Sequence, residues 1–296
     1  MAGWQILNIS QEAQLFLEHK QCVVHLKKTA EKVSLPISHL SAVILESPFI
    51  TLSAALLREM AVQNVALFVC DESHLPCGVL LPYMRYFAYS KVAHLQKGWS
   101  EPFKGRVWQR IVQAKILNQA YVLRKQGHIP EGEKLIFLAR GVTAADVSNI
   151  EGQAAALYWK TLFGANFTRD ESSFVNSALN YGYAVLRGVV ARELVGAGFI
   201  PCFGLHHQSY LNAFNLADDL LEPFRPVVDM TVLNLPSSDN TVLLPQHKSS
   251  LLEILTKEYI FHKQRHSLLI IAGLVAGSLQ QATLEKDYRK IKLFTL

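Results

Sequence analysis

The hydrophobic pattern of this chain changes its period once, near residue 85, and this change limits the possible folds more than any other feature. Before it, the apolar runs are short, rich in β-branched residues and separated by proline or aspartate, which is typical of β-strands. These runs cover residues 15–17, 22–26, 42–45 and 65–69. The exception is residues 51–63, where leucines at helical spacing predict a helix capped by Thr51 or Ser53.

After residue 85 the apolar positions recur with the period of an amphipathic helix. One long helix fits the positions Val107, Ile111, Ile116, Ala120 and Leu123. Further helices are predicted at about residues 144–163, 173–197, 211–222, 251–265 and 266–290, with loops at 127–133, 164–170 and 236–248. The sequence therefore predicts an α+β protein, in which a small β-rich domain (residues 1–85) precedes a larger α-helical domain (residues 86–296).

The positive charge of the chain is concentrated in one segment. The formal net charge is +5, yet residues 85–125 alone hold nine Lys and Arg residues against one acid, Glu101. On a helix that advances about 100° per residue, Arg106, Arg110 and Arg124 lie within about 40° of one another. Such a face favours a polyanion as partner. The alternative is a solvated helix face whose acidic partners lie elsewhere in the fold.

Acids and histidines are densest in the segment that begins at Gly204, which holds His206 and His207 and is followed by Asp219 and Glu222. Residues three apart on a helix share a face, so Asp219 and Glu222 could share a cation. The proline after Glu222 would kink or end that helix and leave the carboxylate near an opening. Imidazole and carboxylate ligands together suit Mg²⁺ or Mn²⁺. Taken alone, an Asp-x-x-Glu on a helix is more often a solvated edge.

Glu151 has a purely structural interpretation. Ser148 and Glu151 fit a capping box, in which the serine side chain binds the backbone of Glu151 and the glutamate side chain reaches back to the backbone of Ser148. Local spacing does not exclude this role, and without further information it is the preferred one.

Four short blocks resemble, in order and spacing, the motifs of the CRISPR-associated integrase family, in the version that accompanies a single RNA-guided effector nuclease. They are SNIEGQAA at 148–155, LNYGYAVL at 179–186, GLHH at 204–207 and DLLEPFRP at 219–226. The blocks span about 80 residues, and the outer thirds of the chain resemble the family only loosely.

The resemblance implies a metal site and a reaction. Matched block by block, the catalytic and metal-binding residues are Glu151, His207 and Glu222, with Asp219 as a further acid that some members use. The position of His206 varies in the family. The cation would be Mg²⁺ or Mn²⁺, and a 3′-hydroxyl would attack a DNA phosphate. A neutral imidazole is needed for ligation, so activity is expected to fall below about pH 6.5 unless the metal lowers that pKa.

The resemblance also implies partners and a fold. It implies a homodimer that binds a second, small ferredoxin-like adaptation protein, with double-stranded DNA as spacer precursor and as CRISPR repeat. The implied fold is an N-terminal β domain followed by an α-helical catalytic domain, in agreement with the change of period. DNA would then be the polyanion that Arg106, Arg110 and Arg124 contact.

Two other functions stay open from the residues alone. The first is an unrelated metal-dependent phosphodiesterase or nuclease, which would need no partner protein. The second is a non-catalytic DNA-binding adaptor, in which Glu151 is only a helix cap.

Composition indicates where such a protein works. The cysteines at 22, 70, 77 and 202 form no CxxC pair and are expected to be reduced, since no secretory signal is recognised at the N-terminus. The longest apolar stretch, residues 267–279, is shorter than the roughly 20 residues that span a bilayer. We expect a cytoplasmic protein in which this stretch is a buried helix.

Overall fold

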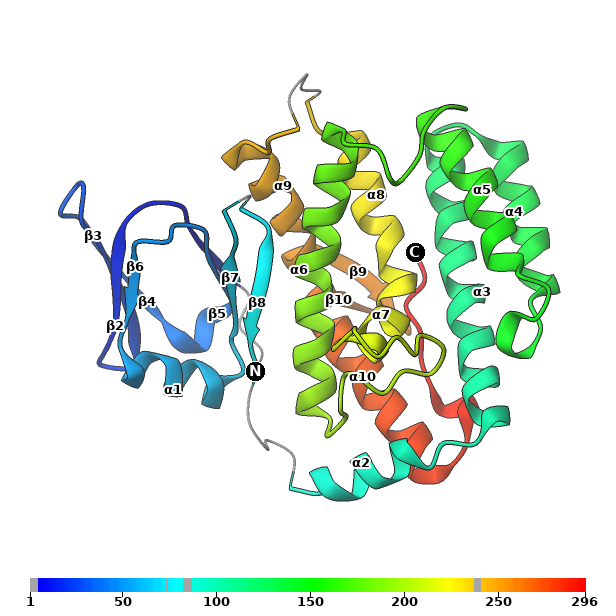
Figure 1. The fold of residues 1–296 in the computed structure, drawn as a ribbon, viewed down its shortest axis with the longest axis horizontal. Coiled ribbons are helices and arrows are strands. Elements are labelled where there is room, and N and C mark those ends of the chain that lie inside the picture. The colour runs from blue at the N-terminus through cyan, green and yellow to red at the C-terminus, as the bar shows by residue number, and fades with distance from the viewer. Residues whose placement is uncertain (1–4, 73, 82–86, 237–240) are drawn as a thin grey trace.

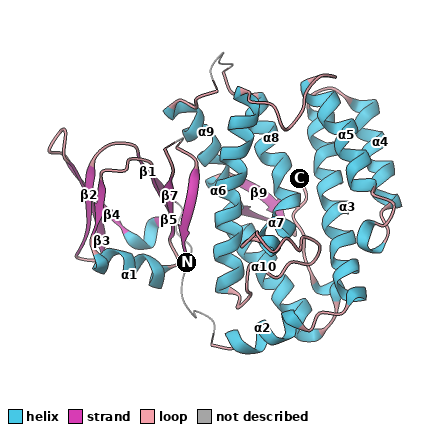
Figure 2. Ribbon diagram, in the orientation of Figure 1, coloured by secondary structure: helices cyan, strands magenta, loops and turns pink. Residues whose placement is uncertain are grey.

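The computed structural model describes residues 5–72, 74–81, 87–236 and 241–296. The strands formed by residues 5–80 gather at one end of the molecule, and the helices that follow them in the chain lie at the other, as Figure 1 and Figure 2 show. The predicted α+β class is confirmed. The expected boundary between residues 85 and 86 lies outside the described residues, between the last strand of the β-rich domain and the first helix of the α-helical domain.

The β-rich domain contains two four-stranded sheets. The first has the order β1 (Gln5–Ile9), β5 (Leu40–Leu45), β7 (Ala66–Cys70), β8 (Pro76–Leu80). The second has the order β4 (Lys32–Pro36), β3 (Gln21–Leu26), β2 (Ala13–Glu18), β6 (Ile50–Leu52). Between β6 and β7 the chain forms α1 (Ala54–Gln63), and Ser53 rather than Thr51 caps it by accepting a hydrogen bond from the backbone N–H of Leu56.

Strand β5 is buried along its whole length because both of its faces are covered. Alternate side chains of a strand point to opposite faces of the sheet. On one face, Val43 and Leu45 pack in a core shared with the second sheet and α1. On the other face, Ala42 and Ile44 belong to the core of the helical domain.

The α-helical domain contains nine α-helices among its described residues. They are α2 (Tyr89–Lys97), α3 (Glu101–Lys125), α4 (Ile129–Gly141), α5 (Ile150–Phe163), α6 (Phe174–Gly196), α7 (Asn215–Leu221), α8 (Arg225–Leu233), α9 (Pro245–Thr256) and α10 (Leu268–Glu285). The 3₁₀ turns η2 (Ala144–Asp146), η3 (Glu222–Phe224) and η4 (Tyr288–Lys290) lie among them. Helix α6 is central, because it contacts β7 and β8 on one side and α7, α8, α9 and α10 on others (Figure 1).

The two domains share a packed interface along α6. The ring of Phe68 fills the space beside Gly188, where a Cβ atom would lie far inside van der Waals contact. Buried Arg192 donates through Nη1 to the backbone oxygens of Ser41 and Asn64, at 2.8 and 3.0 Å. The domains therefore meet through a continuous core and buried polar contacts, rather than through a solvated linker region.

The structure corrects the predicted secondary structure in several places. Helix α9 begins at Pro245, inside the loop expected at residues 236–248. Residues 127–133 were expected to be a loop, but α4 begins at Ile129, because Pro130 lies in the first turn, where its missing N–H costs no hydrogen bond. Residues 251–265 were expected to be one helix, but α9 ends at Thr256. The chain then forms an antiparallel hairpin of β9 (Glu258–Phe261) and β10 (Gln264–Ser267).

Helix α10 contains the longest apolar stretch of the chain, and its position explains that composition. By length and composition alone it could cross a membrane, the one such helix among the described residues. In this fold it packs against α6, α9 and α2, and side chains such as Ile271, Val275 and Leu279 are buried. The predicted buried helix is confirmed.

Candidate functional site

One residue of helix α3, Lys115, contacts both glutamates of the candidate site. The Nζ atom of Lys115 lies 2.5 Å from Oε1 of Glu151 and 2.5 Å from Oε2 of Glu222. Three separate segments, α3, the start of α5 and η3, therefore bring two carboxylates onto a single ammonium group. The Lys115 side chain is only 12% exposed, so water screens these interactions weakly.

Glu151 lies in the first turn of α5 and is not used as a cap. Asn149 caps this helix by accepting from the backbone N–H of Gly152, and Asp146 accepts from the N–H groups of Ile150 and Glu151. The capping box that Ser148 and Glu151 could have formed is therefore not the structure adopted. Other side chains satisfy the helix start, and the Glu151 carboxylate turns to Lys115.

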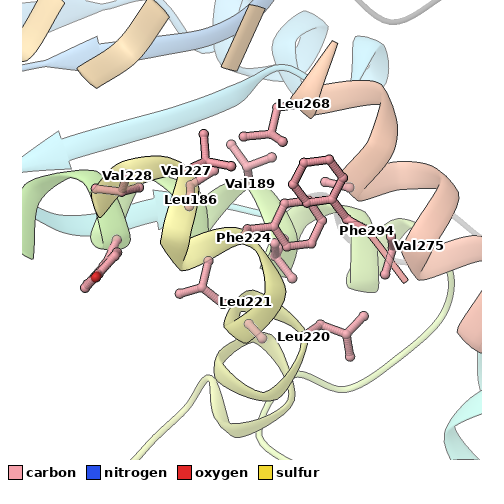
Figure 3. Close-up of a cluster of buried hydrophobic side chains, with 14 of the residues drawn as sticks. Leu186, Val189, Leu220, Leu221, Phe224, Val227, Val228, Leu268, Val275 and Phe294 are labelled. Carbon is pink, nitrogen blue, oxygen red and sulfur yellow. The ribbon is translucent and has the colours of Figure 1, made fainter. Parts of the chain in front are cut away.

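Glu222 lies in η3, the turn between α7 and α8, and is buried. The expectation that Pro223 would leave this carboxylate near an opening is wrong, since the chain turns directly into α8 and the core encloses η3. Phe224 stacks on Phe294 at 5.2 Å between ring centroids, as Figure 3 shows. From α3, Asn118 donates to the backbone oxygen of Pro223 at 2.6 Å. These contacts fix Glu222 relative to α3.

Two cations keep Glu222 ionised. Oε1 accepts from Nε of Arg225 at 2.9 Å, while Oε2 contacts Lys115. Burial alone would raise the pKa of Glu222, but the charges of Arg225 and Lys115 outweigh burial and lower the pKa to about 2. Oε2 has no hydrogen bond of good geometry among the described residues, and the cation that it contacts is the ammonium of Lys115.

Asp219 fixes the conformation of the loop that carries His206 and His207. It is fully buried and accepts from the backbone N–H groups of Leu205, His206 and His207, and it lies 2.7 Å from Nδ1 of the His207 ring. These contacts engage the oxygens of Asp219 within the loop, and a cation shared by Asp219 and Glu222 stays a prediction. An ionised carboxylate only accepts hydrogen bonds, so Nδ1 of His207 carries the proton and Nε2 keeps its lone pair in the neutral ring.

The rings of the two neighbouring histidines lie against the same tryptophan in different orientations. The ring of His206 stacks on buried Trp108 at 4.2 Å and 2°, while the ring of His207 meets the edge of Trp108 at 5.8 Å and 87°. The hydrogen bond with Asp219 raises the pKa of His207, although burial acts in the opposite direction, and the charge of Glu222 raises it further.

The structure brings together some of the expected ligands and not others. Glu151 and Glu222 meet at Lys115, whereas His207 lies on its own loop and is held by Asp219. Within the described ranges, no group of three or more His, Cys, Asp and Glu side chains lies close enough to hold one metal ion as it stands.

Sequence reasoning missed Lys115 and the residues that support Glu222. A signal for Lys115 existed, because it lies four residues after Ile111 and three before Asn118, on the apolar face of α3, where a lysine is unusual. The support of Glu222 continues inward from Arg225, whose guanidinium lies 4.6 Å from the ring centroid of Tyr183. Tyr183 and Tyr158 both donate to Asp229, Tyr158 at 2.9 Å.

Asp229→Asn is expected to flatten the dependence of stability on pH. Burial raises the pKa of Asp229 to about 7, against the hydrogen bonds that lower it. A raised acid pKa contributes stability that is complete below the unfolded value of about 3.9 and is lost as pH rises through about 7. The melting temperature of the variant minus that of the parent should therefore increase by about 3 °C or more between pH 5 and pH 8. An equal difference at both pH values would contradict the assignment.

The three arginines on the expected DNA face have different surroundings. Arg106 is exposed and donates to Gln109. Arg110 is half-buried and donates through Nη1 to the backbone oxygens of Tyr288 and Arg289, each at 3.0 Å. Arg124, at the far end of α3, lies 3.6 Å from Glu133 of α4. Contact of all three with DNA stays a prediction, and Arg106 and Arg124 are its exposed members.

Arg106→Gln is expected to reduce the slope of log K against log salt for DNA binding by about one unit, equally for all sequences. Arg110→Gln is the comparison, because Arg110 ties α3 to the C-terminal segment and its loss should lower thermal stability as well. The measurement is DNA binding by fluorescence anisotropy across a salt series. An unchanged slope for Arg106→Gln would return this face to a solvated surface.

Comparison with known protein sequences gives consistent matches. A family model described as CRISPR associated protein Cas1 matches residues 7–242, more than half of the chain. The CRISPR-associated endonuclease Cas1 of Neisseria meningitidis serogroup C (strain 8013) is 39% identical over 292 residues, which cover 98% of this chain and 95% of that protein. A CRISPR-associated endonuclease Cas1 of Pyrobaculum aerophilum is 28% identical over 235 residues, 72% of this chain and 77% of that protein.

Solved structures with this fold are similar over nearly the whole chain. A casposase bound to its integration product has a TM-score of 0.77 at 17% identity, covering 99% of this chain and 94% of that one. A Cas1 protein from Thermotoga maritima has a TM-score of 0.74 at 14% identity, covering 95% and 97%. At such identities the likeness concerns the fold.

Proposed function

This chain belongs to the CRISPR-associated Cas1 family, and from that premise we propose that it is a metal-dependent DNA integrase and endonuclease that inserts new spacers into a CRISPR array. In the proposed reaction, a 3′-hydroxyl attacks a phosphodiester of the repeat. Water in place of the hydroxyl gives endonuclease activity. No covalent bond between enzyme and DNA is required.

The observation that carries this proposal is the convergence of Glu151 and Glu222 on one cation position. Their segments lie 71 residues apart in the chain, and the capping role that would explain Glu151 structurally is filled by Asn149 and Asp146. Oxygen ligands with one imidazole suit Mg²⁺ or Mn²⁺, and the two carboxylates already share one cation, the ammonium of Lys115. A non-catalytic DNA-binding adaptor would not need two carboxylates that converge on one position in a mostly buried site.

Each residue of the candidate site has its own proposed role. Glu151, Glu222 and Nε2 of His207 would hold the cation, and Asp219 keeps the His207 ring in the required tautomer. The bound cation would polarise the phosphate and stabilise charge on the leaving oxygen. Arg225 holds Glu222 ionised and in place. Arg106 would bind the DNA backbone beyond the site.

The proposed partners follow from the family. A complex that joins a Cas6-RT-Cas1 chain with Cas2 contains the same fold, with a TM-score of 0.73 at 18% identity over 98% of this chain and 36% of that chain. We propose that this chain likewise acts on double-stranded DNA, as a homodimer with a small ferredoxin-like adaptation protein. Its DNA substrates place it in the cytoplasm.

The test is strand transfer of a short duplex with free 3′-hydroxyls into a supercoiled plasmid that carries a repeat, with and without the small partner protein. Integration that requires Mn²⁺ or Mg²⁺ and stops on chelation is the expected result. Activity that survives chelation would overturn the metal-dependent mechanism. Hydrolysis of any small phosphodiester without strand transfer would favour an unrelated phosphodiesterase instead.

A further inference from the structure

Lys115 occupies the position where the proposed function requires a metal ion. Its ammonium group lies 2.5 Å from a carboxylate oxygen of Glu151 and 2.5 Å from one of Glu222, the two acids proposed as ligands. The lysine projects from the apolar face of α3, between Ile111, which is fully buried, and Asn118, which is 1% exposed. A lysine in such surroundings is costly unless its charge is paired.

The local charges balance only because Lys115 is present. Two carboxylates, Glu151 and Glu222, face two cations, Lys115 and Arg225. In the part of the chain that the structure describes, Lys115 is the only residue that forms an ion pair with Glu151. Without it, two acids that are 24% and 6% exposed would face each other across a poorly solvated gap.

Of the two cations, Lys115 is the one that can leave. The guanidinium of Arg225 is held by its hydrogen bond to Glu222 and by the ring of Tyr183. The ammonium of Lys115 sits at the end of a flexible four-carbon chain, and among the described residues its ion-pair partners are the two carboxylates alone. A divalent ion that takes both carboxylates therefore competes with Lys115 and leaves Arg225 in place.

We propose that Lys115 is a built-in counter-ion, which holds Glu151 and Glu222 together in the metal-free protein and must be displaced when the divalent ion binds. This inference rests on the proposed function. It gives Lys115 two opposite effects, since it preserves the shape of the empty site and weakens metal binding. Both effects can be measured without DNA and without any activity assay.

The test is a titration of the full-length protein with Mn²⁺ in the absence of DNA, in which free Mn²⁺ is followed by electron paramagnetic resonance. Lys115→Met, which removes the charge and keeps the length, should bind Mn²⁺ at least about tenfold more tightly than the parent. It should also melt at a lower temperature in chelator and gain more from added Mn²⁺. Lys125→Met, on the exposed last turn of the same helix, is the control and should match the parent in all three measurements.

Lys115→Arg keeps the test decisive if the methionine variant does not fold. A guanidinium can bind both carboxylates at once, so this variant should retain the metal-free melting temperature and bind Mn²⁺ at least about tenfold more weakly. Mn²⁺ binding that is unchanged in Lys115→Arg, or that is unchanged or weaker in Lys115→Met, would overturn the counter-ion role. If the parent itself binds no Mn²⁺, the proposed metal-dependent function fails, which is a different result.

Discussion

Glu151→Gln is expected to abolish strand transfer and cleavage while the melting temperature changes by no more than about 2 °C. Glutamine keeps the size of the side chain and an acceptor oxygen for Lys115, but it cannot supply the full negative charge that a Mg²⁺ or Mn²⁺ ligand provides. Lys115 retains an ion pair with Glu222, which it shares with Arg225, so the buried lysine is not left without an acid. Loss of at least about a thousandfold in the rate is expected, measured by plasmid integration at saturating Mn²⁺.

The matched control is Asn149→Ala, two residues before Glu151. Asn149 supplies the helix cap, so its loss should cost about 1 kcal/mol of stability and leave strand transfer largely intact. Glu151→Gln should therefore lose activity and keep its stability, whereas Asn149→Ala should lose stability and keep its activity. Normal integration by Glu151→Gln would show that Glu151 does not belong to the metal site.

His207→Ala is expected to abolish metal-dependent integration and cleavage, and His206→Ala to retain most of both. Only His207 has a ring that Asp219 orients and a second nitrogen left for a cation. His206 instead stacks flat on Trp108, so its loss removes a ring contact of the loop and no proposed ligand. Strand transfer by the two variants, measured side by side, checks this. The reverse outcome would place the ligand one residue earlier.

The same histidine gives the reaction a pH dependence. The hydrogen bond to Asp219 raises the pKa of His207, so the metal-free imidazole keeps its proton to higher pH than an ordinary histidine. Metal binding requires the neutral ring. The fall of parent activity on acidification should therefore begin above the reference value of about 6.5 at low metal concentration, and move to lower pH as Mn²⁺ is increased.

Elements with strong local signals were predicted well from the sequence. The change of period near residue 85 gave the α+β class, and of the two expected caps of the first helix, Thr51 and Ser53, the structure uses Ser53. The hairpin after Thr256 was missed because its strands are only four residues long and follow an apolar helix without a break in pattern. Short strands carry too few alternating positions to be told from a continuing helix.

The candidate site shows a different limit. Motifs selected Glu151, His207 and Glu222, but they could not show which groups these side chains meet. The ammonium of Lys115 comes from 36 residues before Glu151, and its charge resembled that of a solvated helix face. Asp219 looked like a further ligand on spacing alone, yet its oxygens are used by three backbone N–H groups and a ring nitrogen. Such competition for one carboxylate is set by tertiary structure.

The packed interface along α6 joins the β-rich domain and the α-helical domain into one structural unit. Phe68 lies against the bare backbone of Gly188, and the Glu46 carboxylate meets the ammonium of Lys248 in α9 at 2.6 Å, with both side chains buried. A chain shortened to residues 87–296 would expose this interface and leave buried Lys248 without its ion-pair partner, Glu46. The two domains are therefore coupled through α6. A partner that displaces the strands would also displace the helix that carries the LNYGYAVL motif.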